Sequence, residues 1–204
     1  MKIGILGGSF NPIHNSHLNL AREFMQKLEL DRMSIVPTYL PPHKSGKDLL
    51  NAQDRLEMCR LAVSSEKPPY HVSEYEIKQE GKSYTYRTLM HIQEKYPGAE
   101  LFLLMGGDMF RTVQDWRRAE DIYRLATLCA IQREKDELTL LDMHKDILET
   151  RGARCLLLDI EAQPLSSTFV RQKIEQGEDV SAYLHPDVWA YIREKGLYRK
   201  AEKI

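Results

Sequence analysis

Cysteine is scarce in this sequence, and long apolar runs are missing. The 204 residues include three cysteines, Cys59, Cys129 and Cys155, with no CxxC pair. Each lies in an apolar run, which indicates buried side chains in a reducing compartment and excludes a disulfide framework or a zinc site. No stretch approaches the ~20 apolar residues of a membrane span, and the short apolar run near the first residue does not suffice for a signal peptide. We therefore expect a cytoplasmic protein that makes no contact with membranes.

The sequence also lacks an excess of either charge. It has 29 basic and 30 acidic residues, for a formal net charge of −1, which argues against a general nucleic-acid-binding surface. It contains no internal repeat, no low-complexity tract and no linker-like segment. We predict one domain over residues 1–204, and the sequence leaves open whether copies of the chain assemble into a homo-oligomer.

Strand-like and helix-like segments alternate along the whole sequence. Short apolar runs predict strands over 2–7, 32–38, 70–78, 100–108, 127–132 and 155–160. Periodic apolar patterns predict helices over 16–30, 55–63, 84–96, 121–126 and 137–151, and two more in SSTFVRQKIEQG and VWAYIREKGLY. The alternation predicts an α/β fold, a doubly wound and mostly parallel sheet with helices on both faces.

Four unusual segments follow directly after predicted strands. They are GGSFNPIHNSH, TYLPPHK, MGGD and SST. In a parallel sheet, ligands bind outside the carboxyl ends of the strands, near the point where the strand order reverses. The four segments are therefore expected to meet at one edge of the sheet and to form a binding site there.

The first of these segments combines a tight turn with two histidines. Gly7 and Gly8 allow a ligand to approach the backbone closely, although the pattern is neither a P-loop nor a dinucleotide-binding GxGxxG. His14 and His17, three residues apart at a helix start, lie on one face, where N–H groups and the helix dipole favour an anion. The alternative is a surface histidine pair at a helix cap. A zinc site is the poorer interpretation, because no third ligand is evident.

The other segments contribute charges and one aromatic ring. Lys44, behind two prolines, can bring a mobile positive charge to a phosphate or remain solvated. Asp108 can bind a ribose, hold a metal-bound water or cap a helix. The three hydroxyls of residues 166–168 and nearby Arg171 indicate an anion site, because capping alone needs one hydroxyl. Trp116, in the polar stretch QDWRR, can stack on a ligand ring or pack internally.

Taken together, these motifs resemble those of the nucleotidylyltransferase superfamily, with its HxGH and SxTxxR-type signatures. Within it, the sequence is similar to the bacterial nicotinate-nucleotide adenylyltransferases. The resemblance runs nearly end to end, through GGSFNPIHNSH, PPHK, DRLEMCRLAV, SYTYRTL, LLMGGDMF, the DW pair, PLSSTFVR and YIREKGLY. It implies a Rossmann-like fold and transfer of the adenylyl group of ATP to nicotinate mononucleotide, giving deamido-NAD and pyrophosphate, with Mg²⁺ accompanying ATP.

The resemblance also implies a role for each motif. The ATP phosphates would be held by four cationic or imidazole side chains, namely His14, His17, Lys44 and Arg171. Further contacts to ATP would come from Gly7, Gly8, Ser9, Gly106, Asp108, Ser166, Ser167 and Thr168. Nicotinate mononucleotide would meet Tyr84 and Thr85 and stack on Trp116. No side chain is assigned as a metal ligand.

Two residues depart from the family pattern. Ser16 replaces the glycine of HxGH and narrows the approach of a phosphate to that turn. Arg87 stands where the family usually has an acid or amide, so it either favours an acidic ligand or points away from the site. Two other functions stay open on the sequence: a related transferase for phosphopantetheine or cytidylyl groups, and a nucleotide sensor without turnover.

Overall fold

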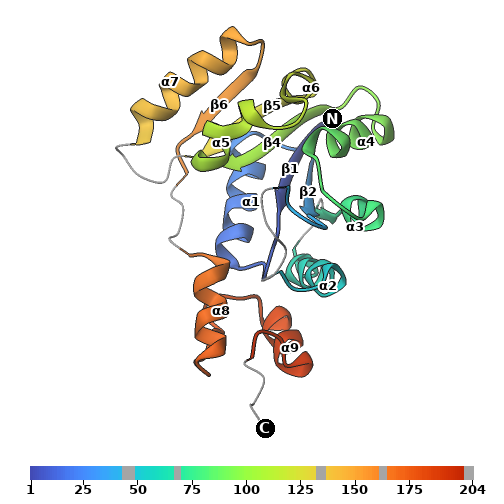
Figure 1. The fold of residues 1–204 in the computed structure, drawn as a ribbon, viewed down its shortest axis with the longest axis vertical. Coiled ribbons are helices and arrows are strands. Elements are labelled where there is room, and N and C mark those ends of the chain that lie inside the picture. The colour runs from blue at the N-terminus through green and yellow to red at the C-terminus, as the bar shows by residue number, and fades with distance from the viewer. Residues whose placement is uncertain (43–48, 67–69, 132–136, 161–164, 200–204) are drawn as a thin grey trace.

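A parallel β-sheet forms the centre of the computed structural model, which describes residues 1–42, 49–66, 70–131, 137–160 and 165–199 (Figure 1). In this described part, the sheet has six strands in the order β3-β2-β1-β4-β5-β6. The strands are β1 (Lys2–Gly8), β2 (Arg32–Pro37), β3 (Tyr70–Val72), β4 (Glu100–Gly106), β5 (Ala126–Ile131) and β6 (Arg154–Leu158). All neighbouring pairs are parallel, which confirms the predicted fold class.

The strand order reverses beside β1, which is where the sequence predicts the binding site. β1 pairs with β2 on one side, Gly7 lying opposite Val36, and with β4 on the other, Leu6 lying opposite Leu104. The carboxyl ends of β1 and β4 are Gly8 and Gly106. In a doubly wound sheet the crevice outside such a reversal is open to a ligand.

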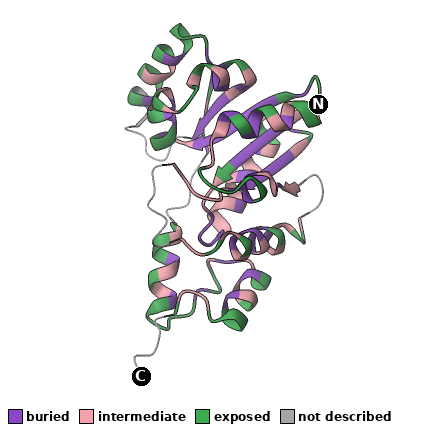
Figure 2. Cartoon of the chain, turned by 45° about the vertical axis from the view of Figure 1, so that its right-hand side comes forward, coloured by how far each residue is buried: buried purple, intermediate pink, exposed green. Residues whose placement is uncertain are grey.

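Helices cover both faces of the sheet. They are α1 (Asn15–Lys27), α2 (Ala52–Val63), α3 (Tyr75–Gln79), α4 (Thr85–Lys95), α5 (Gly107–Thr112), the 3-10 turn η1 (Val113–Asp115), α6 (Ala119–Leu125), α7 (Glu137–Thr150), α8 (Ser167–Glu175) and α9 (Pro186–Lys195). Buried residues concentrate in the strands and on the inward sides of the helices (Figure 2). α8 and α9 lie beyond the carboxyl end of β1 (Figure 1).

Two hydrophobic clusters hold these layers together. One joins alternate strand residues such as Leu6 and Ile35 to α1, α2, α8 and α9. The other joins Ile3, Ile5 and Leu103 to α4, α5, α6 and α7. Because successive strand residues point to opposite faces, a sheet buried on both sides has near-continuous apolar strands, and the runs read from the sequence show this pattern.

The prediction for residues 70–78 is wrong beyond Val72. The strand ends there, and a short helix over Tyr75–Gln79 follows it. The hydroxyl oxygen of Ser73 accepts a hydrogen bond from the N–H of Tyr75 over 3.3 Å, which turns the chain out of the sheet. The strand predicted over 100–108, with its break at the double glycine and the aspartate, ends at Gly106, and Gly107 and Asp108 open α5.

The apolar segments that contain the cysteines are part of the hydrophobic core. Cys59, Cys129 and Cys155 are free and buried, as the sequence predicts, and burial raises the pKa of each thiol, to about 11 for Cys155. Within the described residues, we find no helix with the length and apolar character that crossing a bilayer requires.

Candidate active site

The loop between β1 and α1 carries two stacked histidines. His14 is the N-cap of α1, with an extended backbone (φ −142°, ψ 170°), and His17 lies in the first turn of the helix. Their rings stack with centroids 3.6 Å apart and an interplanar angle of 27°. The two imidazoles thus form one unit at a helix start, where the backbone N–H groups and the helix dipole favour an anion.

A backbone hydrogen bond determines which nitrogen of His17 carries the proton. The N–H of His14 donates to Nδ1 of His17 over 3.2 Å. Since an accepting nitrogen has no hydrogen, this geometry corresponds to a neutral ring with its hydrogen on Nε2. The ring of Phe10 packs on the same imidazole in a T-shaped contact, 5.1 Å between centroids, and limits its rotation. Nε2 of His17 is therefore an oriented donor.

Hydroxyl groups at the start of α8 have two different roles. The side chain of Ser166 caps the helix, accepting from the N–H of Phe169 over 3.1 Å. The hydroxyl of Ser167 donates to the carbonyl of Pro12 over 2.8 Å. One hydroxyl therefore satisfies the helix end, and the next ties α8 to the loop of the histidines. A second helix start is brought beside the imidazole pair in this way.

Arg171 reaches the same loop from the second turn of α8. One of its terminal nitrogens donates to the carbonyl of Asn11 over 2.8 Å, and the other donates to the hydroxyl of Thr168 over 3.3 Å. Oδ1 of Asn11 in turn accepts from the N–H of Leu50 over 3.3 Å and from the hydroxyl of Tyr198 over 2.9 Å. The guanidinium is thereby fixed next to the loop between β1 and α1.

A cavity of about 770 Å³ combines these segments. Its walls come from one side of α1 along its length, from the start of α8, from the end of β5 and from the residues that follow β6. The lining includes His14, His17, Ile131, Ile160, Ser166 and Ser167. Four of the residues proposed from the sequence therefore line one concave space, although they come from segments about 150 residues apart in the chain. A concave space that combines apolar side chains such as Ile131 and Ile160 with polar ones suits a small-molecule ligand.

β1 and β4 are paired as far as Leu6 and Leu104, and both strands end in glycines just beyond that pair. A Cβ added at Gly7 would meet nothing within 4 Å, whereas one at Gly8 would lie 3.1 Å from the ring of Phe10. A side chain at position 8 would thus press on the ring of Phe10, whereas open space faces the backbone at position 7. Gly106 is the N-cap of α5. Asp108 therefore does not cap this helix, and its exposed carboxylate pairs with Arg111 over 2.7 Å.

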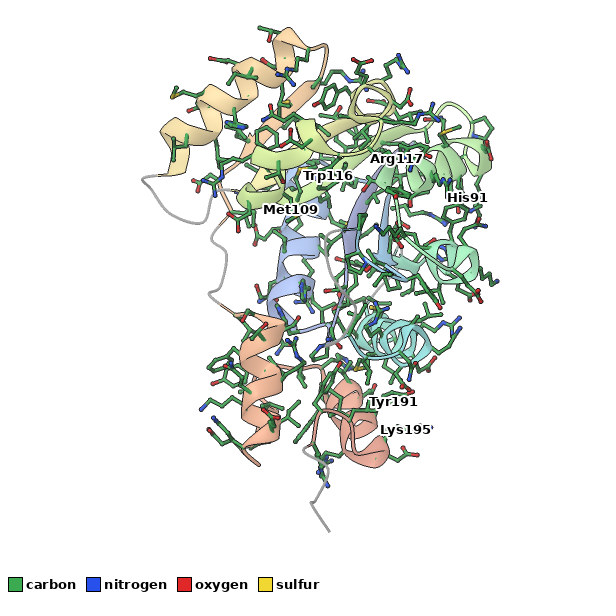
Figure 3. All side chains as sticks on the ribbon, in the orientation of Figure 1. His91, Met109, Trp116, Arg117, Tyr191 and Lys195 are labelled. Carbon is green, nitrogen blue, oxygen red and sulfur yellow. The ribbon has the colours of Figure 1, made fainter. Side chains whose placement is uncertain are left out.

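The residues expected to meet nicotinate lie around the start of α4. Tyr84 is the N-cap of this helix and Thr85 its first residue, while Trp116 directly follows the η1 turn. Tyr84 and Trp116 both pack, half-buried, against the same hydrophobic cluster. The guanidinium of Arg117 lies 5.0 Å from the centroid of the Tyr84 ring, and Figure 3 shows Arg117 on the side of α4 and Trp116 nearer to β4.

Arg87 joins this aromatic group. Its guanidinium lies 5.7 Å from the centroid of the Tyr84 ring, and its Nε donates to the hydroxyl of Tyr86 over 3.1 Å. This hydrogen bond lowers the pKa of the Tyr86 phenol. Arg87 is exposed in the first turn of α4. It therefore adds positive charge at the start of this helix, next to Tyr84 and Thr85.

Two buried charged side chains near the site were missed on the sequence. Arg55 is fully buried in α2 and Glu76 is 8% exposed in α3. Oε1 of Glu76 accepts from the hydroxyl of Thr88 over 2.5 Å, and burial raises the pKa of this carboxyl. The apolar pattern does not reveal them, because Arg55 is the first residue of the predicted helix 55–63 and Glu76 falls in a segment predicted to be a strand. Lys44, which was predicted, lies outside the described residues.

Comparisons with known proteins identify the family of this chain. The cytidylyltransferase-like family model matches residues 5–173. A protein of Clostridium botulinum (strain Kyoto / Type A2) named "Probable nicotinate-nucleotide adenylyltransferase" is 34% identical over 96% of this chain and 98% of its own length. One of Clostridium tetani with the same name is 33% identical over 97% of this chain and 99% of its own.

Solved structures show the same fold at lower identity. A Plasmodium falciparum nicotinic acid mononucleotide adenylyltransferase complexed with NaAD has a TM-score of 0.75 at 18% identity, and 97% of each chain is covered. The same enzyme complexed with APC has a TM-score of 0.76 at 19% identity, covering 97% of this chain and 96% of that one.

Proposed function

The chain belongs to the cytidylyltransferase-like family and, within it, to the nicotinate-nucleotide adenylyltransferases, and from this premise we propose that it transfers the adenylyl group of ATP to nicotinate mononucleotide. The products are nicotinate adenine dinucleotide and pyrophosphate, so the reaction is a step in NAD biosynthesis. The observation that carries this proposal is the stacked pair of His14 and His17 in a cavity shared with the start of α8.

The nucleophile is the 5′-phosphate of nicotinate mononucleotide, which is already an anion at neutral pH. One of its oxygens forms a bond to the α-phosphorus of ATP while the bond from that phosphorus to the bridging oxygen breaks, and pyrophosphate leaves with the electron pair. No general base and no covalent enzyme intermediate are needed. What the protein must provide is alignment of two polyanions, and positioning of this kind can contribute about 7–11 kcal/mol.

The residues around the cavity suit the growing negative charge. Nε2–H of His17 is an oriented donor, the starts of α1 and α8 offer backbone N–H groups, and Arg171 adds a fixed cation. Donors that are already in position are worth more than mobile ones, because they need no reorganisation during the reaction. Lys44 would add a fourth group at the phosphates. Gly7, Gly8, Ser9 and Thr168 would contact ATP, with Gly106 and Asp108 at its ribose.

Nicotinate mononucleotide would occupy the region of Tyr84, Thr85 and Trp116. The half-buried Trp116 offers a face for stacking on a pyridine ring. The start of α4, an 11-residue helix, and the nearby guanidinium of Arg117 suit the negative carboxylate of nicotinate. The same surroundings give no comparable advantage to a neutral amide, which supports the acid as the substrate.

A divalent metal ion generally takes part in nucleotidyl transfer, and we propose Mg²⁺. The described residues contain no group of three or more His, Cys, Asp or Glu side chains that could hold a metal ion. The donor set near the cavity is imidazole and guanidinium, and Mg²⁺ prefers oxygen ligands. It would therefore arrive on the phosphates of ATP and lower their charge, while the side chains contact the remaining oxygens.

We further propose that residues 1–204 act as one nucleotidylyltransferase domain in the cytoplasm, without nucleic acid or membrane partners. The hydrophobic cluster that joins the sheet to α8 and α9 supports a single unit, and the near-neutral net charge agrees with small-molecule substrates.

Pyrophosphate release with ATP and a panel of acceptors tests the function. We expect turnover with nicotinate mononucleotide, weaker turnover with its amide form, and none with phosphopantetheine. Preferred turnover of phosphopantetheine would assign a sister transferase instead. Tight binding of ATP in a calorimeter without pyrophosphate release from any acceptor would indicate a nucleotide sensor and contradict the proposal.

A further inference from the structure

Arg55 is a fully buried cation whose partners are carbonyl oxygens. Its Nε donates to the carbonyl of Leu50 over 2.9 Å. One terminal nitrogen donates to the carbonyls of Ser9 over 2.8 Å and Thr38 over 2.6 Å, and the other donates to that of Tyr39 over 2.9 Å. None of the carboxylates described in the structure pairs with it. The side chain thus joins the segments that follow β1 and β2 to the segment that precedes α2.

This arrangement costs free energy in the folded state. A buried charge without a counter-ion is unfavourable, and burial lowers the pKa of the Arg55 guanidinium below its ordinary value. An apolar side chain at position 55 would fit the amphipathic pattern of α2 without this cost. Arg55 therefore has a role that an apolar packing residue cannot fill. Its hydrogen bonds indicate this role, because they fix four backbone carbonyl groups.

The hydrogen bond to Ser9 fixes the orientation of one peptide group. Among the described residues the only cis peptide bond is Asn11–Pro12, so the peptide between Ser9 and Phe10 is trans and planar. Its C=O and N–H point in opposite directions. Because the carbonyl of Ser9 faces Arg55, the N–H of Phe10 faces away from α2.

Phe10 itself has a backbone that needs to be held. Its φ is +43°, in the left-handed region that a non-glycine residue rarely adopts. A residue in this conformation, with its neighbours, gathers N–H groups into a concavity that binds anions. Within the described residues, no acceptor receives a hydrogen bond from the N–H of Phe10. Its ring meanwhile contacts His17.

We propose that Arg55 is a positioning residue for the nucleotide-binding loop: it holds the carbonyl of Ser9 inward and so presents the N–H of Phe10 to a phosphate of the bound nucleotide. This inference rests on the proposed function and deepens it. Arg55 does not touch the nucleotide. It acts through the Ser9–Phe10 peptide, and the carbonyls of Thr38, Tyr39 and Leu50 keep its guanidinium in place while it does so.

The test compares Arg55→Lys and Arg55→Met with Met58→Ala. Lysine keeps the charge but loses the planar fork of donors, methionine loses both, and Met58 is a fully buried residue of the same helix. We expect both Arg55 variants to lose at least tenfold in kcat/KM and in affinity for a non-hydrolysable ATP analogue, measured where they are folded. Met58→Ala should lower Tm, but its kcat/KM and its affinity for the ATP analogue should stay within twofold of wild type. Wild-type kcat/KM and affinity in either Arg55 variant would overturn the proposal.

A measurement on the wild-type protein covers the case in which the variants do not fold. Labelling with ¹⁵N-phenylalanine gives five amide signals, one for each phenylalanine, and Phe10→Leu identifies the signal of Phe10. This signal should shift when the ATP analogue or nicotinate mononucleotide is added, and a signal that moves with neither would overturn the proposal. Failure of the proposed function looks different: the wild type would release no pyrophosphate while the Phe10 signal still shifts.

Discussion

Arg171 donates a hydrogen bond to the backbone carbonyl of Asn11 over 2.8 Å and thereby joins a helix near the end of the chain to the first loop. The same loop carries His14 and His17, and Ser167 adds a second hydrogen bond to it at Pro12. The start of α8 is therefore held by direct hydrogen bonds to the loop that leads into α1. Such preorganisation is what charge stabilisation in a phosphoryl transfer requires.

The first prediction concerns the donor on His17. Replacing His17 with alanine removes Nε2–H and the acceptor for the N–H of His14. We expect kcat to fall by about 10²-fold or more, as for loss of one positioned donor to a developing charge. Pyrophosphate release at saturating ATP and nicotinate mononucleotide measures this directly.

A histidine outside the cavity provides the matched control for that variant. His91 stacks on Tyr75 with ring centroids 4.1 Å apart and lies on α4 (Figure 3). His91→Ala should leave kcat within about twofold of wild type. If His17→Ala and His91→Ala turn over equally fast, the phosphate role of His17 is wrong.

The second prediction separates stacking from packing at tryptophan. Trp116→Ala should raise KM for nicotinate mononucleotide about tenfold or more and leave KM for ATP unchanged, because stacking on an aromatic ring is worth about 1–3 kcal/mol. Trp189→Ala is the control, since Trp189 packs against the hydrophobic cluster that includes α8 and α9. The guanidinium carbon of Arg193 lies 5.5 Å from the centroid of its ring. It should lower Tm with both KM values unchanged. A Trp116→Ala variant with a lower Tm and an unchanged KM would make Trp116 a packing residue.

The sequence was sufficient for the fold because its signals are local. Apolar runs of strand length and helical periods each identify one element, and their alternation specifies a parallel sheet. The error at residues 70–78 has the same origin: YHVSEYEIK alternates like a strand, but Ser73 bonds back to the N–H of Tyr75 and starts a helical turn. A side-chain-to-backbone bond of this kind leaves no trace in an apolar pattern.

The sequence predicts only those residues of the candidate site that belong to a motif following a predicted strand. His14, His17, Ser166 and Ser167 line one cavity, and each was found from a motif that follows a strand. Arg55 could not be found, because its value depends on carbonyl groups of segments that meet only in the folded chain. Backbone acceptors have no sequence signature, so a buried charge that binds them is visible in the structure alone.

The third prediction uses the pH dependence of stability at Glu76. Burial raises the pKa of this carboxyl in the folded state, so folding favours its protonated form. The contribution of Glu76 to stability is fully present below the pKa of a glutamate in the unfolded chain, about 4.3. This contribution is lost as the pH rises through the higher pKa that Glu76 has in the folded state. Glu76→Gln has no such proton to lose. We expect the Tm of Glu76→Gln minus that of wild type to be near zero at pH 4 and to become increasingly positive toward pH 8–9.

Thermal unfolding of the two proteins across this range checks the sign. Glu74 is a suitable control, because it is only half-buried and paired with Lys78 and Arg60, and these partners lower the pKa of its carboxyl. Glu74→Gln should give a Tm difference that does not become positive as the pH rises. A difference for Glu76→Gln that is constant with pH would contradict burial of an ionisable carboxyl at this position.

The last prediction uses two adjacent glycines with different surroundings. A Cβ at Gly8 would lie 3.1–3.3 Å from three atoms of the Phe10 ring, while a Cβ at Gly7 would meet nothing within 4 Å. Gly8→Ala must therefore move a ring that is 2% exposed and packs on His17. Overpacking of this kind typically costs about 1–3 kcal/mol, so we expect Gly8→Ala to lower Tm. It should also lower kcat, because the imidazole of His17 loses its support.

Gly7→Ala tests whether the open space at the end of β1 serves a ligand. Since no atom beyond the adjacent residues is within 4 Å of the added methyl group, Tm should change by no more than about 1–2 °C, as for other substitutions without a clash. If ATP approaches the backbone there, the methyl group meets the nucleotide and raises KM for ATP severalfold. Measured together, the two variants separate packing from binding: a Gly7→Ala protein with wild-type Tm and wild-type KM would remove Gly7 from the nucleotide site and leave Gly8 as a packing requirement only.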